Sequence, residues 1–135
     1  MKSTHRYNKS IEVFDVLCGN EFYYAECGRN AKFLRAMAKA VWAQHGRKNY
    51  RCPRVIFLQV PKQGGSYLNW CEGQSLIAIN RACQNISTLL HEMVHALGYY
   101  KHSSGFVRKY ADLMSEYGKC DYAYMMVLAK MAGTV

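Results

Sequence analysis

Acidic residues are scarce in this chain of 135 residues, which contains 9 Asp and Glu against 18 Lys and Arg. The formal net charge is therefore +9. Such a surplus favours association with nucleic acid, anionic surfaces or acidic proteins through long-range attraction. The charge bears on the partner of the protein and does not identify a reaction.

Long apolar runs are also missing. The longest stretches, such as Tyr122–Ala129, fall far short of the roughly 20 residues that cross a bilayer. The first ten residues are polar and basic and contain no apolar core of the signal-peptide type. We therefore expect a soluble, cytoplasmic protein with no membrane partner, whose oligomeric state the sequence leaves open.

The six cysteines include no Cys-x-x-Cys pair, so a zinc ribbon built from thiolates is not expected. In an intracellular protein we expect these cysteines to be reduced and to pack as small hydrophobes. A chain of this length buries a sufficient core without disulfides. We predict a single domain over residues 1–135.

An H-E-x-x-H pentad occupies residues 91–95. On a helix, His91 and His95 lie on one face one turn apart, so both imidazoles can bind the same metal ion. Glu92 lies beside them, where its carboxylate can take a proton from a metal-bound water. Composition alone produces such a pentad in about one chain of this kind in a hundred. The residues around the pentad must therefore decide whether it is a metal site.

The surroundings of the pentad favour a metal site. Apolar residues cover most of the circumference of the predicted helix, namely Leu89, Leu90, Met93, Val94, Ala96 and Leu97. Three ionisable side chains in a buried helix are costly unless something pairs them, and a metal ion does so. The alternative is a structural cluster in which these groups satisfy one another.

A catalytic zinc site needs three protein ligands and an open position for water. His102 is the first candidate for the third ligand, because it follows His95 by seven residues, beyond a turn predicted at Gly98. Phe106 can then wedge the His102 loop against the core. Glu116 is the alternative, since some zinc peptidases take a glutamate from a later helix as third ligand.

The pentad and the downstream element His102-x-x-x-Phe106 resemble the SprT-like metallopeptidases, which include the Spartan and Wss1-type proteases that degrade proteins crosslinked to DNA. The likeness spans residues 30–118, and the short loop before His102 is nearest to Wss1-type or small bacterial and phage members. The resemblance implies a zincin-like domain with one Zn²⁺ held by His91, His95 and His102. It also implies that Glu92 is the general base for hydrolysis of a protein or peptide substrate, including DNA-associated proteins.

The N-terminal half shows β and helix signals in turn. The runs 11–18 and 21–27 flank Gly19-Asn20 and predict a hairpin, with a helix over 13–22 as the alternative. Asn30 is a predicted cap for a helix that ends near His45. The inward stripe of this helix is expected to be Phe33, Leu34, Met37, Ala38 and Val41.

Strands and helices are predicted after this helix. Residues 54–60 predict a central strand buried on both faces, and 66–71 with 74–80 predict a hairpin. The predicted N-cap of the pentad helix is Asn85 or Ser87. A further helix is predicted over 105–117, with Ser103 or Ser104 as its N-cap. The apolar stripe of that helix is expected to be Phe106, Tyr110, Leu113 and Tyr117. In a closing helix over 120–131, Met125, Met126, Leu128 and Met131 are expected to pack on the core. The predicted class is α+β, with a small mixed or antiparallel sheet against the pentad helix and two or three further helices.

Other residues are weaker candidates for a functional role. Tyr99, Tyr100 and Tyr110 are expected either to stabilise an oxyanion or to pack at the rim. Lys32, Arg35 and Lys39 share one helix face, which is either a solvated surface or a contact to a phosphate backbone. Residues 76–80 or their hairpin partner are expected to receive an extended substrate. The remaining histidines, His5 and His45, lack ligand spacing and are expected at the surface.

Taken together, these patterns predict a zinc-dependent metallopeptidase in which Glu92 activates a zinc-bound water. The alternative is a zinc-stabilised module that binds nucleic acid or another protein without turnover. An intact Glu92 favours catalysis over this alternative, but it does not identify the substrate.

Overall fold

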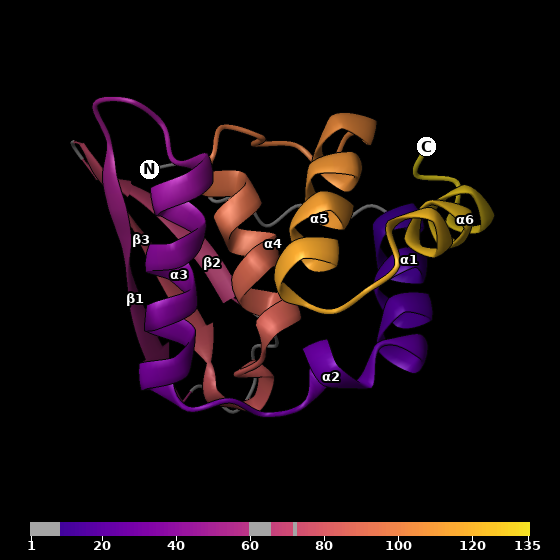
Figure 1. Ribbon diagram of the computed structural model, residues 1–135, viewed down its shortest axis with the longest axis horizontal. Helices are drawn as coiled ribbons and strands as arrows, with labels where there is room; N and C mark the ends of the chain where they lie inside the picture. Colours follow the sequence, from indigo (N-terminus) through magenta and orange to yellow (C-terminus); the bar gives the residue numbers. More distant parts are fainter. Residues whose placement is uncertain (1–8, 60–65, 72) are drawn as a thin grey trace.

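The computed structural model of the chain describes residues 9–59, 66–71 and 73–135. The elements in order are α1 (Lys9–Glu21), α2 (Tyr23–Glu26), α3 (Ala31–His45), β1 (Arg51–Leu58), β2 (Ser66–Cys71), β3 (Gln74–Asn80), a 3₁₀ turn η1 (Arg81–Cys83), α4 (Ile86–Ala96), α5 (Ser104–Tyr117) and α6 (Tyr122–Ala132). Figure 1 shows the sheet at one side, α3 and α4 beside it, α5 in the middle, and α1 with α6 at the far side. The predicted α+β class is confirmed.

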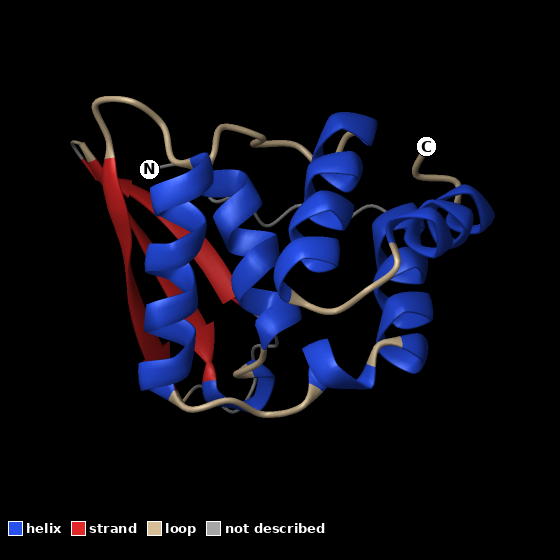
Figure 2. Ribbon diagram, in the orientation of Figure 1, coloured by secondary structure: helices blue, strands red, loops and turns tan. Residues whose placement is uncertain are grey.

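The three strands form one mixed sheet in the order β1, β3, β2. β3 runs parallel to β1 and antiparallel to β2, which confirms the predicted hairpin of 66–71 with 74–80. The described helices all lie on one side of this sheet (Figure 2). Every helix in the described ranges is too short or too polar to cross a membrane.

The prediction of a central strand over 54–60 was wrong, because β1 is an edge strand and β3 is the central one. Pro53 and Val55 of β1 are buried, whereas Arg54 is exposed. An unbroken apolar run indicates β structure but does not determine which strand is central. Since β3 is paired on both sides, residues 76–80 cannot receive an extended substrate, and only the hairpin partner β2 remains for that role.

The predicted hairpin over 11–27 was also wrong, because these residues form α1 and α2. Ile11, Phe14 and Cys18 of α1 are each at most 2% exposed. Their spacings of three and four residues place them on one helical face, and α1 packs against α6. Tertiary packing of this apolar face therefore outweighs the β propensity of the segment.

A substitution at Gly19 tests the helix over Lys9–Glu21. Gly19 lies near the end of α1 in open space, where an added Cβ would meet only the Glu26 side chain, at 4.0 Å. Alanine there should raise the free energy of unfolding by about 0.5–1 kcal/mol, because glycine loses more backbone entropy in a helix. Urea denaturation measures the change. Gly98→Ala is the control of opposite sign, because Gly98 has a φ of +113°, and destabilisation by both variants would contradict the helix.

The helices α3, α4 and α5 each begin after a residue whose side chain caps the first turn, as the sequence predicts. The Asn30 side chain accepts a hydrogen bond from the Phe33 amide at 2.8 Å. Of the paired candidates, the structure uses Asn85, which accepts from Thr88 at 2.9 Å, and Ser103, the N-cap of α5. These caps satisfy amide groups that the first turn of a helix leaves without intrahelical partners.

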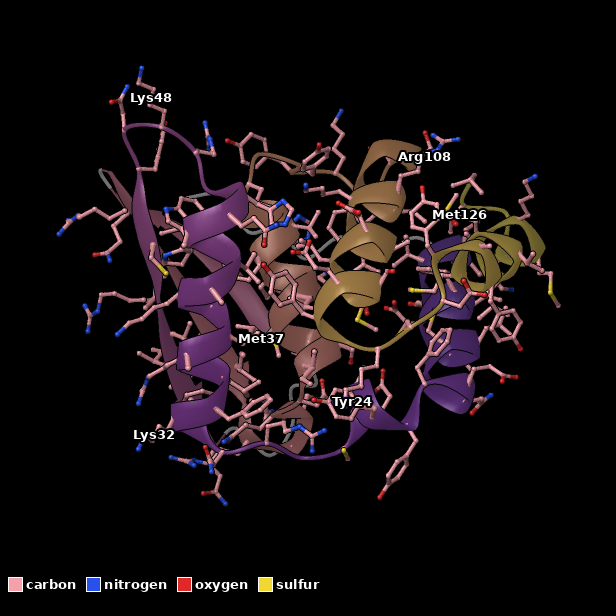
Figure 3. The ribbon with its side chains drawn as sticks, in the orientation of Figure 1. Tyr24, Lys32, Met37, Lys48, Arg108 and Met126 are labelled. Atoms are coloured by element: carbon pink, nitrogen blue, oxygen red, sulfur yellow. The ribbon has the colours of Figure 1, made fainter. Side chains whose placement is uncertain are left out.

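The buried faces of α3 and α6 include the residues predicted for them, except for one residue in the first turn of α3 and one in the last turn of α6. In the α3 stripe, Leu34, Ala38 and Val41 are buried and Met37 is half-buried. Met37 points from α3 toward α4 in Figure 3. Phe33 is 38% exposed, because it lies in the first turn, where its ring meets the Arg29 guanidinium at 5.4 Å. Met131 in the last turn of α6 is 68% exposed, so both predictions of core packing were wrong.

Candidate metal centre

The pentad helix α4 runs through the core of the protein. Leu89, Leu90, Met93, Val94 and Ala96 are each 0% exposed. The polar residues between them are nearly as buried, with exposed fractions of 6% for His91, 1% for Glu92 and 1% for His95. Because ionisable groups at such depth need polar partners, these three side chains mark a site inside the fold.

The loop between α4 and α5 brings His102 back to this helix. The Gly98 amide donates to the His95 carbonyl at 3.0 Å, and the Tyr99 amide donates to the Val94 carbonyl at 3.3 Å. Gly98 adopts a φ of +113°, a conformation that side chains with a Cβ rarely take. The chain therefore reverses at Gly98, as the sequence predicts, and His102 faces His95.

The Phe106 ring packs against the rings of all three histidines. Its ring centroid lies 4.9 Å from that of His91, 4.7 Å from that of His95 and 4.9 Å from that of His102. The side chain is 1% exposed and comes from the first turn of α5, just after the Ser103 cap. The predicted wedge at Phe106 is thus observed, and it limits the orientations that the three imidazoles can take.

The Nε2 atoms of the three histidines converge. The His102 Nε2 atom lies 3.0 Å from that of His91 and 3.2 Å from that of His95. Potential ligand atoms of all three residues lie within 4.8 Å of one another. Around a zinc ion with nitrogen ligands at about 2.0–2.1 Å, tetrahedral geometry separates the ligand atoms by roughly 3.3 Å. The group can therefore hold a metal ion with little rearrangement.

A backbone carbonyl determines the tautomer of His95. The Nδ1 atom of His95 lies 2.7 Å from the carbonyl oxygen of Tyr99. Because a carbonyl oxygen only accepts, Nδ1 carries the proton, and the Nε2 of a neutral His95 presents its lone pair to the site. Metal-binding histidines commonly donate their other nitrogen in this way. The sequence held no signal for this contact, since every residue has a carbonyl.

The chemistry of the donor set fits a metal better than mutual hydrogen bonding. An imidazole nitrogen carries either one proton or one lone pair, so it makes one hydrogen bond. The His102 Nε2 atom has two close neighbours, at 3.0 and 3.2 Å, and only one of these contacts can be a hydrogen bond. A metal ion would accept all three lone pairs together. Three imidazoles suit zinc, copper, iron or nickel rather than magnesium or calcium.

Glu116, the alternative third ligand, makes a different contact. Its Oε1 atom accepts a hydrogen bond from the Nε2 of His45 at 2.9 Å. The His45 Nδ1 atom accepts from the Lys109 ammonium at 3.1 Å, so this histidine is held between two charged groups. The structure groups His102 rather than Glu116 with the α4 histidines. His45 was expected at the surface but is half-buried and joins α3 to α5, while His5 lies outside the described residues.

The three tyrosines differ in their placement. Tyr110 is 4% exposed and stacks on Phe106 with ring centroids 6.2 Å apart, so it packs behind the centre. Burial raises the pKa of its hydroxyl well above the ordinary value. Tyr99 and Tyr100 are 38% and 49% exposed. The Tyr100 hydroxyl accepts a hydrogen bond from the Arg47 guanidinium at 3.1 Å, which connects this loop to the segment just after α3.

The basic stripe of α3 does not join the metal centre. Lys32, Arg35 and Lys39 are exposed, and the Arg35 Nε atom donates to the Val55 carbonyl of β1 at 3.1 Å. Their side of α3 therefore faces β1, whereas the histidines belong to α4 and the loop before α5. Any role of these residues concerns a separate surface.

The two buried cysteines, Cys18 and Cys120, offer no alternative reactive centre. Five of the described cysteines are free thiols, namely Cys18, Cys27, Cys52, Cys83 and Cys120. Burial raises the pKa of Cys18, and it raises that of Cys120 to about 11. Both thiols therefore remain protonated near neutral pH, and a protonated thiol is a poor nucleophile and metal ligand.

Comparison of the chain with protein-family models, with curated proteins and with solved structures finds no significant match in any of the three. The chemistry of the histidine group must therefore carry the functional argument. That group combines three converging imidazoles with a buried glutamate one residue after the first of them.

Proposed function

We propose that the protein is a zinc-dependent metallopeptidase with a zincin-like fold, related to the SprT-like family. The observation that carries this proposal is the convergence of the Nε2 atoms of His91 and His95, on the helix that also bears Glu92, with that of His102 from the following loop. A bound zinc ion would lower the pKa of water to near neutrality and polarise a peptide carbonyl. Three histidines leave one tetrahedral position open for that chemistry.

Each histidine has a distinct structural role in this proposal. His95 keeps its lone pair on Nε2 through the Tyr99 carbonyl, so its ligand atom is prepared before any metal binds. His91 is fixed one turn earlier, against the Phe106 ring. His102 is half-exposed, whereas the other two are buried. Solvent and substrate would therefore reach the centre from the side of the His102 loop.

Glu92 is the proposed general base. It follows His91 directly and precedes His95 by three residues, so it lies on the adjoining face of α4. Its carboxylate would accept a proton from the attacking water and then donate that proton to the departing amine nitrogen. At 1% exposure, the group acts where bulk water is excluded, and electrostatic interactions are stronger there.

The edge strand β2 is the proposed site for the substrate backbone. β2 packs against α4 and pairs with β3 along one side, while among the described strands nothing pairs with its other side. An extended peptide can add to such an edge through main-chain hydrogen bonds, which give affinity without demanding a particular sequence. This arrangement would hold a peptide bond beside the pentad helix.

Removal of the metal is the direct test of this function. The purified protein should contain one zinc ion per chain, and 1,10-phenanthroline should abolish its cleavage of unfolded casein. Added Zn²⁺ should restore cleavage and Mg²⁺ should not, because three imidazoles bind magnesium poorly. Metal analysis with a gel-based assay measures both properties. Full cleavage by protein stripped of metal would overturn the proposal.

The alternative, a zinc-stabilised binding module without turnover, has a different signature in the same experiment. Chelation would then lower the melting temperature, because a metal that binds only the folded state stabilises it. No cleavage would occur with or without zinc. The buried carboxylate of Glu92 favours the peptidase, since a purely structural site has no need of a base next to its ligands.

A further inference from the structure

The positive charge of the protein is concentrated in one third of the chain. Residues 27–71 contain no Asp or Glu, although the whole chain has 9 of them. The same segment holds nine of the 18 Lys and Arg, namely Arg29, Lys32, Arg35, Lys39, Arg47, Lys48, Arg51, Arg54 and Lys62. The other two thirds of the chain are formally neutral. The entire net charge of +9 therefore belongs to the segment that forms α3, β1 and β2.

A groove between α3 and β1 collects four of these basic side chains. It has a volume of about 500 Å³, and its lining includes Arg35 and Lys39 from α3 and Arg51 and Arg54 from β1. Among the described residues that line it, none is acidic. Figure 3 shows Lys32 near the start of α3 and Lys48 in the loop after it, both pointing outward. The basic side chains thus extend along the whole length of α3.

Arg35, one of the groove cations, is held in place by a backbone carbonyl and an aromatic ring. The Arg35 Nε atom donates to the Val55 carbonyl at 3.1 Å, and its guanidinium lies 5.2 Å from the Phe57 ring centroid. The ion pairs observed in the described part of the chain join His45 to Glu116 and Lys109 to Asp112. None of them involves a groove cation. Like charges lining one concave surface repel, and a bound anion would relieve that repulsion.

We propose that this groove binds the phosphodiester backbone of a nucleic acid. Guanidinium groups match phosphate oxygens with paired hydrogen bonds, and three of the four cations that line the groove are arginines. α3 has 15 residues, so it is about 22 Å long. That length corresponds to roughly six phosphates of one strand at 3.4 Å each.

The shape of the surface favours a polymer over other anions. A groove is concave and elongated, so a single strand fits its lining residues more closely than the flat surface of a bilayer does. The row of cations continues beyond the groove to Lys32 and Lys48, which a single phosphate could not contact together. The groove borders α3 and β1, whereas the three histidines belong to α4 and the loop between α4 and α5 (Figure 1). A bound nucleic acid would therefore leave the metal centre accessible, and the two proposals stand independently.

Salt-dependent binding of a fluorescent 20-nucleotide single strand tests the groove, with the full-length protein and anisotropy as readout. Four phosphate contacts predict a slope of about −2.8 for log K against log salt concentration. The variant Arg51→Gln with Arg54→Gln should reduce this slope to about −1.4 and weaken binding at least about tenfold at low salt. Both arginines are exposed, so the fold should be preserved.

Arg108→Gln with Lys130→Gln is the matched control, because it removes the same charge from exposed positions on α5 and α6. It should change the affinity by less than about threefold, since these residues would contact no phosphate. Lys39→Gln is a second groove variant, and circular dichroism melting checks each fold. Four results would each overturn the proposal. They are an equal loss of affinity in the control variant, no binding of the strand at low salt, displacement of the strand by free phosphate at equal concentration, and binding only to phosphatidylserine vesicles.

Discussion

Glu92→Gln is expected to retain zinc and to lower kcat for peptide hydrolysis by about 10²–10⁴, the usual contribution of a general base. Glutamine has nearly the same shape as glutamate, so the packing of a side chain that is 1% exposed should be preserved. Its amide cannot accept the proton of the attacking water. Because Glu92 is not one of the three grouped histidines, metal analysis should still find one zinc per chain, and KM should change little.

Glu116→Gln supplies the matched control for this experiment. Glu116 is exposed and accepts a hydrogen bond from His45, so the same chemical change there should leave kcat unaltered. Measuring kcat, KM and zinc content for both variants separates a missing base from a missing metal. Turnover by the Glu92 variant within about tenfold of the original would remove glutamate from the mechanism, since general-base catalysis contributes more than this.

The helices around the metal centre could be predicted because their signals are local. Asn30, Asn85 and Ser103 each precede an apolar run with helical spacing. Each is the N-cap of its helix, and its side chain accepts a hydrogen bond from an amide in the first turn. The Gly98 turn was likewise visible, because glycine is the residue best suited to a positive φ. With His91 and His95 on one helix and a turn after it, the return of His102 to this helix could be predicted from the spacing.

The N-terminal helix was predicted only as the alternative to a hairpin, because local and tertiary preferences conflict there. The runs on both sides of Gly19-Asn20 are rich in β-branched and aromatic residues, which favour strands. The spacing of Ile11, Phe14 and Cys18 is helical, but this pattern decides the outcome only when a partner such as α6 is present. Similarly, the apolar run of β1 does not reveal that β3, and not β1, has strands on both sides.

The groove between α3 and β1 depends on contacts between distant segments. Lys32, Arg35 and Lys39 share a helix face in the sequence, which left both a solvated surface and a phosphate contact open. Arg51 and Arg54 join them only because β1 lies at the edge of the sheet, beside α3. The same fact that corrects the strand order therefore creates the basic groove.

His102→Ala should weaken zinc binding at least about 100-fold, since even loss of a residue that only supports a ligand costs 10–100-fold. The geometry carries this expectation, because the His102 Nε2 atom is the one that approaches both other Nε2 atoms, at 3.0 and 3.2 Å. His102 is half-exposed, so its truncation should leave a smaller cavity than truncation of His91 or His95. Competition with a chromogenic chelator measures the affinity, and the fold is checked by circular dichroism.

Glu116→Ala separates the two ligand schemes in the same assay. If His102 completes the site, this variant should bind zinc normally, and the loss of the contact to His45 should cost at most about 1 kcal/mol, because exposed ion pairs contribute little. The reverse pattern, with zinc lost in the Glu116 variant and kept in the His102 variant, would require α5 to rotate so that Glu116 leaves His45 and turns to the histidines. The 2.9 Å contact between Glu116 and His45 and the Phe106 ring against all three histidines both oppose that rotation.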